Sequence, residues 1–95
     1  MDDVISHEDY GRGGIFFVMR NGIRVAEMTY HRTGEQVVVI DHTEVDEVLR
    51  GRGVARKLLD AAVAWARATD TMIIPSCSYV TLQFARDASI RDVLA

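Results

Sequence analysis

The sequence predicts an α/β domain built on a mixed, mostly antiparallel sheet, with one long helix and a short C-terminal helix. Alternating apolar and polar residues, broken by glycine-containing turn signals, fill the first half of the chain and indicate a meander of strands. A stretch rich in Ala, Leu and Arg and free of Gly and Pro follows at residues 56–69, and a short apolar run follows at 72–75. Because a helix separates the last two strands, these should pair in parallel.

The turns define the antiparallel part of the sheet. A short strand is expected within residues 2–8, a glycine-containing loop at 10–14 and a strand at 15–20. Asn21-Gly22 is a strong signal for a two-residue hairpin, which predicts a partner strand at 23–31. Thr33-Gly34 indicates a second tight connection into the β-branched run at 36–42. Strict alternation would place one set of side chains on a common face there: Val38, Ile40, His42 and Glu44.

The long helix is expected over residues 53–68. Its apolar residues recur at helical spacing and predict a stripe that packs on the sheet: Val54, Leu58, Ala61, Ala62, Trp65 and Ala66. A strand at 72–75, a short helix at 78–86 and a last turn within 89–95 complete a single domain over residues 1–95. Met19, Met28 and Met72 are expected to fill the core.

A glycine-rich turn at residues 50–55, Arg-Gly-Arg-Gly-Val-Ala, joins the strand to the long helix. The first N–H groups of a helix have no intrahelical acceptor, and the helix dipole favours an anion at that end. A dinucleotide fingerprint is excluded because Arg56 occupies its third glycine position, and a nucleoside-triphosphatase loop is excluded because Val54 follows Gly53 in place of Lys. The turn therefore predicts another kind of phosphate site, with a purely structural turn as the alternative.

The Arg-x-x-Gly-x-Ala pattern of this turn resembles the pyrophosphate-binding turn of the GNAT superfamily of N-acetyltransferases. His42-Thr43-Glu44-Val45 before it and residues 75–80, Pro-Ser-Cys-Ser-Tyr-Val, after it resemble minimal, single-domain acetyltransferases of the YjdJ type, over about residues 5–87. The resemblance implies transfer of an acetyl group from acetyl-coenzyme A to an amine, without a metal. Typical members carry helices between their first two strands, and Asn21-Gly22 leaves no room for them. The acceptor is therefore not named.

The resemblance also implies where acetyl-coenzyme A binds. Its pyrophosphate would rest on the turn, and its pantetheine arm would run along backbone groups near the end of the preceding strand. Tyr79 could donate a hydrogen bond to the departing thiolate or only pack its ring. The expected cofactor residues are Thr43, Val45, Arg50, Gly51, Arg52, Gly53, Val54, Ala55 and Tyr79.

Three residues are candidates for the chemistry. Cys77 precedes a predicted helix, whose dipole favours a thiolate, so it could serve as nucleophile or acyl carrier; the alternative is a small buried apolar residue. His42 could accept the proton of the amine at neutral pH, and Glu44 could orient the ring or act as the base. A structural role at a strand end is the alternative for His42. The general acid has no assigned residue, because Phe84 stands nearest the usual position and has no proton to give.

Composition narrows the choice of partners. The formal net charge of −3 argues against a broad nucleic-acid surface, whereas positive charge gathers around the turn at Arg50, Arg52, Arg56 and Lys57. A single cysteine excludes an internal disulfide and a multi-cysteine metal site. No apolar run is long enough for a membrane span, and the acidic N-terminus does not resemble a signal peptide, so a cytoplasmic location is expected. A non-catalytic acyl-coenzyme A-binding module and an interaction domain stay open as alternatives.

Overall fold

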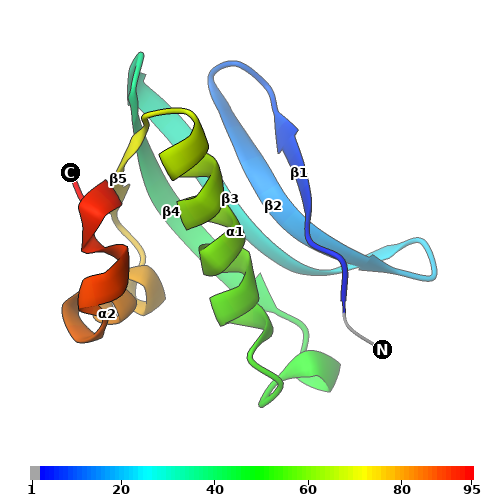
Figure 1. Ribbon diagram of the computed structural model, residues 1–95. Helices are drawn as coiled ribbons and strands as arrows, with labels where there is room; N and C mark the ends of the chain where they lie inside the picture. The colour runs from blue at the N-terminus through cyan, green and yellow to red at the C-terminus, as the bar shows by residue number, and fades with distance from the viewer. Residues whose placement is uncertain (1–2) are drawn as a thin grey trace.

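Five strands form one sheet, in the order β1-β2-β3-β4-β5, in the computed structural model, which describes residues 3–95 (Figure 1). Strands β1 (Ser6–Asp9), β2 (Gly13–Arg20), β3 (Ile23–Gly34) and β4 (Val37–Val45) are antiparallel, and β5 (Met72–Pro75) pairs in parallel with β4. Helix α1 (Val54–Ala68) connects β4 to β5, and α2 (Ser78–Arg86) follows β5. Two 3₁₀ helices complete the chain, η1 (Glu47–Leu49) and η2 (Ala88–Val93). The predicted fold class is confirmed.

Local sequence signals account for the position of most elements. Asn21 and Gly22 both have positive φ, at 51° and 77°, which is the backbone of a type I′ hairpin. The bounds of β5 and α2 agree with the prediction, and α1 begins one residue later than expected. The first strand begins at Ser6, and Asp2, where the prediction began, lies outside the described residues.

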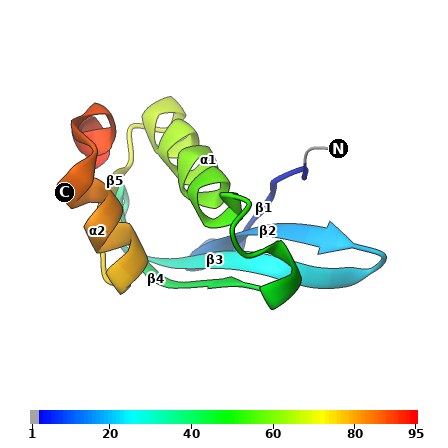
Figure 2. The ribbon, with the colours of Figure 1, turned by 90° about the horizontal axis from the view of Figure 1, so that it is seen from below.

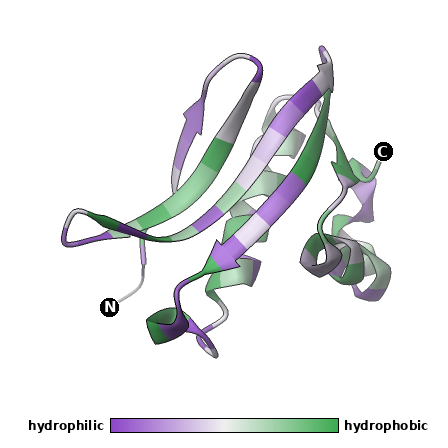
Figure 3. Cartoon of the chain, turned by 180° about the vertical axis from the view of Figure 1, so that it is seen from behind, coloured by the Kyte–Doolittle hydropathy of each residue, from purple (hydrophilic) through white to green (hydrophobic). Residues whose placement is uncertain are grey.

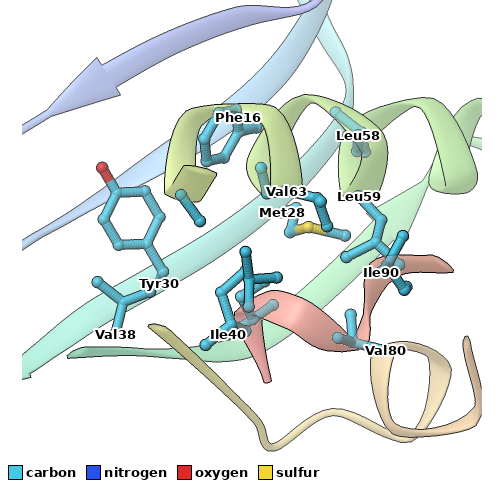
Figure 4. Packing of buried hydrophobic residues seen from close by; sticks show 14 of the residues in the cluster. Phe16, Met28, Tyr30, Val38, Ile40, Leu58, Leu59, Val63, Val80 and Ile90 are labelled. Carbon is cyan, nitrogen blue, oxygen red and sulfur yellow. The ribbon is translucent and has the colours of Figure 1, made fainter. Parts of the chain in front are cut away.

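The core lies between the sheet and α1. Helix α1 crosses one face of β2, β3 and β4, while α2 and η2 lie on the side of β5 (Figure 2). Side chains from the sheet and the helices meet in one cluster, with Met28, Ile40, Leu58 and Leu59 among its fully buried members (Figure 4). Burying an aliphatic side chain of this size stabilises the fold by about 1.5–3 kcal/mol.

Helix α1 is buried over a wider arc than its predicted stripe. Leu59 and Val63 are fully buried, although they lie off that stripe, and Ala61 and Trp65 are only half-buried. The reason is that α1 contacts η2 in addition to the sheet. The sequence predicted that α1 packs on the sheet alone, whereas in the structure α1 packs on both the sheet and η2.

A β-bulge at Asp41 changes the faces of β4. Tyr30 pairs with Ile40 and Thr29 pairs with His42, so Asp41 is an extra residue on β4. Asp41 and His42 therefore both point away from α1, and Thr43 points toward it. The expectation that Val38, Ile40, His42 and Glu44 share one face is wrong: the first two are buried, and the last two are exposed on the opposite face.

A second irregularity accounts for Met19. The register of β2 and β3 shifts between Val18 and Met19, and the side chain of Met19 is 45% exposed near the hairpin. It does not fill the core as predicted, unlike Met28, which is fully buried. Within residues 3–95, no helix is both long enough and apolar enough to cross a membrane.

No helix of residues 3–95 lies over the sheet face away from α1 (Figure 3). We call this face the outer face. On β3 and β4 its polar side chains are Glu27, Thr29, His31, Asp41, His42 and Glu44.

Candidate functional site

The glycine-rich turn has a backbone that only glycine adopts easily. Gly51 has φ 80° and Gly53 has φ 73°, both in the left-handed region. A Cβ atom added at either position would meet no atom within 4 Å, so the space above both glycines is open. Leu49 is fully buried just before the turn and anchors it to the core.

Helix α1 begins at this turn with its donors unsatisfied. Gly53 is the N-cap and provides no side-chain cap, and no acidic residue lies in the first turn. The first intrahelical bond runs from the N–H of Lys57 to the carbonyl of Gly53 (3.1 Å). The three N–H groups between them have no acceptor within the helix, because an α-helix provides none for its first residues. The donor set and the open space fit a phosphate group.

The arginines around the turn divide into two kinds. Arg50 and Arg52 are exposed, and neither makes an ion pair or a side-chain hydrogen bond within residues 3–95. Arg56 instead donates to Asp60 (2.9 Å), Gln83 (2.8 Å) and Asp87, and its hydrogen bonds to the carboxylates of Asp87 and Asp60 raise the pKa of its guanidinium. Arg50 and Arg52 are therefore available to an anion, whereas Arg56 holds α2 and the residue after it against α1.

Strands β4 and β5 separate next to the turn. Their parallel pairing ends at Ile40 and Pro75, and the carbonyl of Ile40 then accepts the N–H groups of Ser76 (2.9 Å) and Cys77 (3.3 Å). Beyond this fork, residues 41–45 of β4 have no partner strand on the β5 side in the described chain. A strand edge of this kind offers backbone groups to an extended ligand with amides, such as pantetheine.

Thr43 and Cys77 meet across the fork. The Cys77 Sγ lies 3.3 Å from the Thr43 Oγ1, and both residues are half-buried. Cys77 is the N-cap of α2, but its side chain makes no capping hydrogen bond. Tyr79 lies in the first turn of α2, where burial raises the pKa of its hydroxyl and keeps it protonated. Thr43 and Cys77 are thus in contact at the fork, and Tyr79 follows Cys77 by two residues.

His42 and Glu44 form a separate group on the outer face. The His42 Nε2 lies 3.3 Å from the Glu44 Oε2 and 3.5 Å from the Glu27 Oε2. The bulge turns His42 away from the face that Thr43 shares with the core, and no hydrogen bond joins His42 to Cys77 within residues 3–95. The structure thus does not bring these two predicted catalytic side chains together.

Sequence reasoning missed Glu27. It pairs directly with Glu44 across β3 and β4, and this pairing depends on the bulge at Asp41, for which the sequence contains no clear signal. The two glutamates also line a cavity of about 150 Å³ on the outer face, together with Arg24, Val25, Ala26 and Asp46. A second cavity, of about 340 Å³, lies at the far end of α1 beside Arg67 and Asp92. Among the described residues, no group of three or more His, Cys, Asp and Glu side chains is placed to hold a metal ion.

Comparisons with known proteins give consistent matches. A family model described as GCN5-related N-acetyl-transferase matches residues 16–93. Protein NATD1 from Homo sapiens is 35% identical over 66 residues, which are 68% of this chain and 58% of that protein. Protein NATD1 from Mus musculus is also 35% identical over 66 residues, and they make up 60% of its length. The chain thus spans well under two thirds of the length of these relatives.

Solved structures agree in fold. An NMR structure of a protein from Staphylococcus aureus described as GCN5-like has a TM-score of 0.74 and 32% identity, and the match covers 95% of this chain and 87% of that chain. A GNAT family acetyltransferase from Elizabethkingia anophelis, solved with acetyl-CoA bound, has a TM-score of 0.62 and 14% identity, with 79% of this chain and 52% of that chain covered. At that identity the second match shows a common fold and no more.

Proposed function

The chain belongs to the GCN5-related N-acetyltransferase family, and from this premise we propose that it transfers an acetyl group from acetyl-coenzyme A to an amine. One observation carries the proposal: the turn at the start of α1 combines two left-handed glycines under open space with two exposed arginines that no described acidic residue engages. The pyrophosphate would bind there, on Arg50, Gly51, Arg52, Gly53, Val54 and Ala55. Acetyl-coenzyme A supplies the activated thioester.

The fork between β4 and β5 would hold the pantetheine arm. Backbone groups near Thr43 and Val45 would bond its amides, and Tyr79 would lie beside the departing thiolate as a protonated donor. This arrangement would bring the thioester close to Thr43 and Cys77, which are in contact at the fork.

The acceptor amine would approach from the outer face. Glu27 and Glu44 carry negative charge beside the small cavity and would attract an ammonium group, and His42 or Glu44 would remove its first proton. A free thiol at Cys77 suits the cytoplasm, which keeps thiols reduced, and we propose that location for the protein.

Two routes for the acetyl group remain in this proposal. In direct transfer the amine attacks the thioester, and Cys77 only lines the pocket. In a relay, Cys77 Sγ attacks first, the coenzyme A thiolate leaves, and the amine then attacks the cysteine thioester and releases Sγ. The contact with Thr43 supports the relay, since a hydroxyl donating to sulfur would stabilise the thiolate.

Intact-protein mass spectrometry after incubation with acetyl-coenzyme A tests both the function and the route. The relay predicts an acetyl adduct that is absent from Cys77→Ala and Cys77→Ser, while coenzyme A still raises the melting temperature of both variants. An Ala variant that transfers acetyl at the wild-type rate would establish direct transfer. If coenzyme A does not change the melting temperature of the wild-type protein, the proposed function is wrong.

A non-catalytic acyl-coenzyme A-binding module is the second candidate. The segment between β1 and β2 is three residues long, and β2 joins β3 through Asn21-Gly22, so neither connection contains a helix. In the superfamily such helices help to build the acceptor site. Coenzyme A binding without thiol release in the presence of any amine would favour this candidate.

A further inference from the structure

A second pair of imidazole and carboxylate lies on the outer face, apart from His42. The His31 Nδ1 is 2.7 Å from the Asp41 Oδ2, and the Thr29 hydroxyl donates to the other oxygen, Oδ1, over 2.6 Å. Each carboxylate oxygen therefore has its own partner. The hydrogen bonds from Thr29 and His31 outweigh burial, which acts in the opposite direction, and lower the pKa of Asp41. Asp41 is thus a fixed negative charge beside the ring.

The position of Asp41 places this pair at the fork. Asp41 is the extra residue of the β4 bulge and directly follows Ile40, the last residue of β4 that pairs with β5. The carbonyl of Ile40 accepts the N–H of Cys77. The peptide group between Ile40 and Asp41 is therefore in direct contact with the backbone of Cys77. The proposed function places the thioester at this point.

The ring of His31 is oriented for proton transfer. Its Nδ1 is occupied by Asp41, and its Nε2 makes no hydrogen bond within residues 3–95. The side chain is 51% exposed, so a ligand on the outer face can reach it. The carboxylate at Nδ1 fixes the orientation of the ring, and an imidazolium held in this way can donate a proton from Nε2.

The reaction needs such a donor. An ammonium acceptor loses one proton before it attacks and a second after the C–N bond has formed, and the coenzyme A thiolate must gain one. Within the proposed function, His42 or Glu44 takes the first proton, and Tyr79 offers the thiolate a hydrogen bond. Because burial raises the pKa of Tyr79, its hydroxyl gives up a proton less readily, and Phe84 is buried and has no proton to give, so proton transfer to the thiolate still needs a residue.

We propose that His31, held by Asp41, is a catalytic residue that protonates the departing thiolate and then takes the second proton from the acetylated nitrogen. The inference rests on the proposed function. The imidazolium Nε2 gives its proton to sulfur as the C–S bond breaks and the C–N bond is complete. The positively charged nitrogen of the new amide then returns a proton to Nε2. Atoms and charge balance, and His31 ends the cycle in the form in which it began.

The dependence of the rate on pH tests this role. The assay follows thiol release from acetyl-coenzyme A with 1,4-diaminobutane or a lysine-containing peptide as acceptor. Because the acid must be protonated, His31→Asn should lower kcat by about 100-fold and remove the fall in rate at high pH. Asp41→Asn should lower kcat by a smaller factor, because the ring loses the carboxylate that orients it, and Thr29→Val should lower kcat by less again. His42→Asn is the contrasting variant, because loss of a base changes the acidic side of the profile.

The leaving group provides an independent readout. A thiol that is a weaker base than coenzyme A needs less help from an acid, so His31→Asn should lose much less rate with an acetyl thioester of an aromatic thiol. Melting temperature and coenzyme A affinity should stay near wild type, which separates catalysis from folding. If His31→Asn keeps the high-pH fall and loses equal rate with both thioesters, the inference is overturned and the proposed function stands. If the wild-type protein releases no thiol with either acceptor, both are overturned.

Discussion

At the scale of single residues, Gly53 combines a left-handed backbone with open space above it. Its left-handed backbone costs an ordinary residue about 1–2 kcal/mol, and Asn tolerates this region better than most. At the same time the open space above Gly53 means that a side chain there would occupy the proposed phosphate position. The effect of backbone strain can be separated from the effect on binding, because the side chains of Asp and Asn have nearly the same shape and differ in charge.

Gly53→Asp and Gly53→Asn should therefore lose similar stability but differ in ligand binding. Both variants should melt at a lower temperature than the wild type. Coenzyme A should raise the melting temperature of the Asn variant by a reduced amount, and that of the Asp variant not at all, because a carboxylate would face the phosphates. Differential scanning fluorimetry with and without coenzyme A measures this. Equal shifts for Asp and Asn would place the phosphates elsewhere.

His7 is a residue to which the sequence assigned no role, and its role is in packing. Its Nε2 bonds the Tyr30 hydroxyl over 2.6 Å, its ring stacks on Phe16 with centroids 4.0 Å apart, and its edge meets Trp65 at 5.2 Å. Burial lowers the pKa of His7, Arg32 adds to this effect and Asp9 opposes it. Burial also raises the pKa of Tyr30 to about 12, so the hydroxyl remains a donor.

The sign of the pH dependence follows from that lowered pKa. The unfolded chain binds a proton at His7 at a higher pH than the folded chain does, so stability is complete above the ordinary histidine value of 6.5 and is lost as pH falls through the folded pKa. The free energy of unfolding should decrease between about pH 7 and pH 5. His7→Gln should flatten this change. Urea denaturation at several pH values tests it, and an unchanged slope in His7→Gln would assign the titration to another group.

At the scale of elements, Arg56 connects α1 to the C-terminal part of the chain. One guanidinium bonds Asp60 on its own helix, Gln83 on α2 and Asp87 just after α2. The hydrogen bonds from Ser89 and Arg56 lower the pKa of Asp87 to about 2, so the pair stays charged under ordinary conditions. Because Cys77 and Tyr79 begin α2, this tie also helps to hold the fork in place.

Arg56→Gln should loosen α2 without unfolding the sheet. Amide hydrogen exchange should become faster in α2 and η2 and remain slow in β2 and β3, because the latter do not depend on this contact. Arg86→Gln is the matched control, since Arg86 is exposed and engages no partner in the described chain. Faster exchange throughout the molecule would mean that Arg56 supports global stability and not only the docking of α2.

The elements also show which features a sequence can predict. The hairpin at Asn21-Gly22 and the bounds of β5 and α2 were predictable because each depends on neighbouring residues. The bulge at Asp41 and the second buried side of α1 were not, because they depend on strand register and on the docking of η2. The turn was predictable from its motif, whereas the separation of His42 from Cys77 and the contacts of His31 followed from the bulge alone. The roles of the candidate site residues stay predictions.

At the scale of the whole molecule, charge is unevenly distributed. The protein carries a formal net charge of −3, so a polyanion is attracted only where arginines gather. Arg52 lies in the turn, whereas Arg67 lies about four helical turns away, where it bonds Asp92 and the carbonyl of Ser89. That distance exceeds the Debye length of about 8 Å at physiological salt.

Arg52→Gln should therefore weaken coenzyme A binding and Arg67→Gln should not, although both remove one positive charge. The loss at Arg52 should be about tenfold at low salt and smaller at high salt, because salt screens the attraction. Isothermal titration calorimetry at two salt concentrations measures both. A comparable loss of affinity in Arg67→Gln would indicate a site at the other end of α1.

The bulge at Asp41 has a consequence for deletions. Because Asp41 is the additional residue, a chain without it keeps Ile40 and Thr43 facing the core and His42 facing outward, and β4 becomes a regular strand. Loss of this one codon should thus preserve the fold, whereas loss of the codon for Ile40 or Thr43 would shift the faces of the strand. When homologous sequences are aligned, a single gap opposite position 41 would then mark proteins that keep the architecture and have lost the partner of His31.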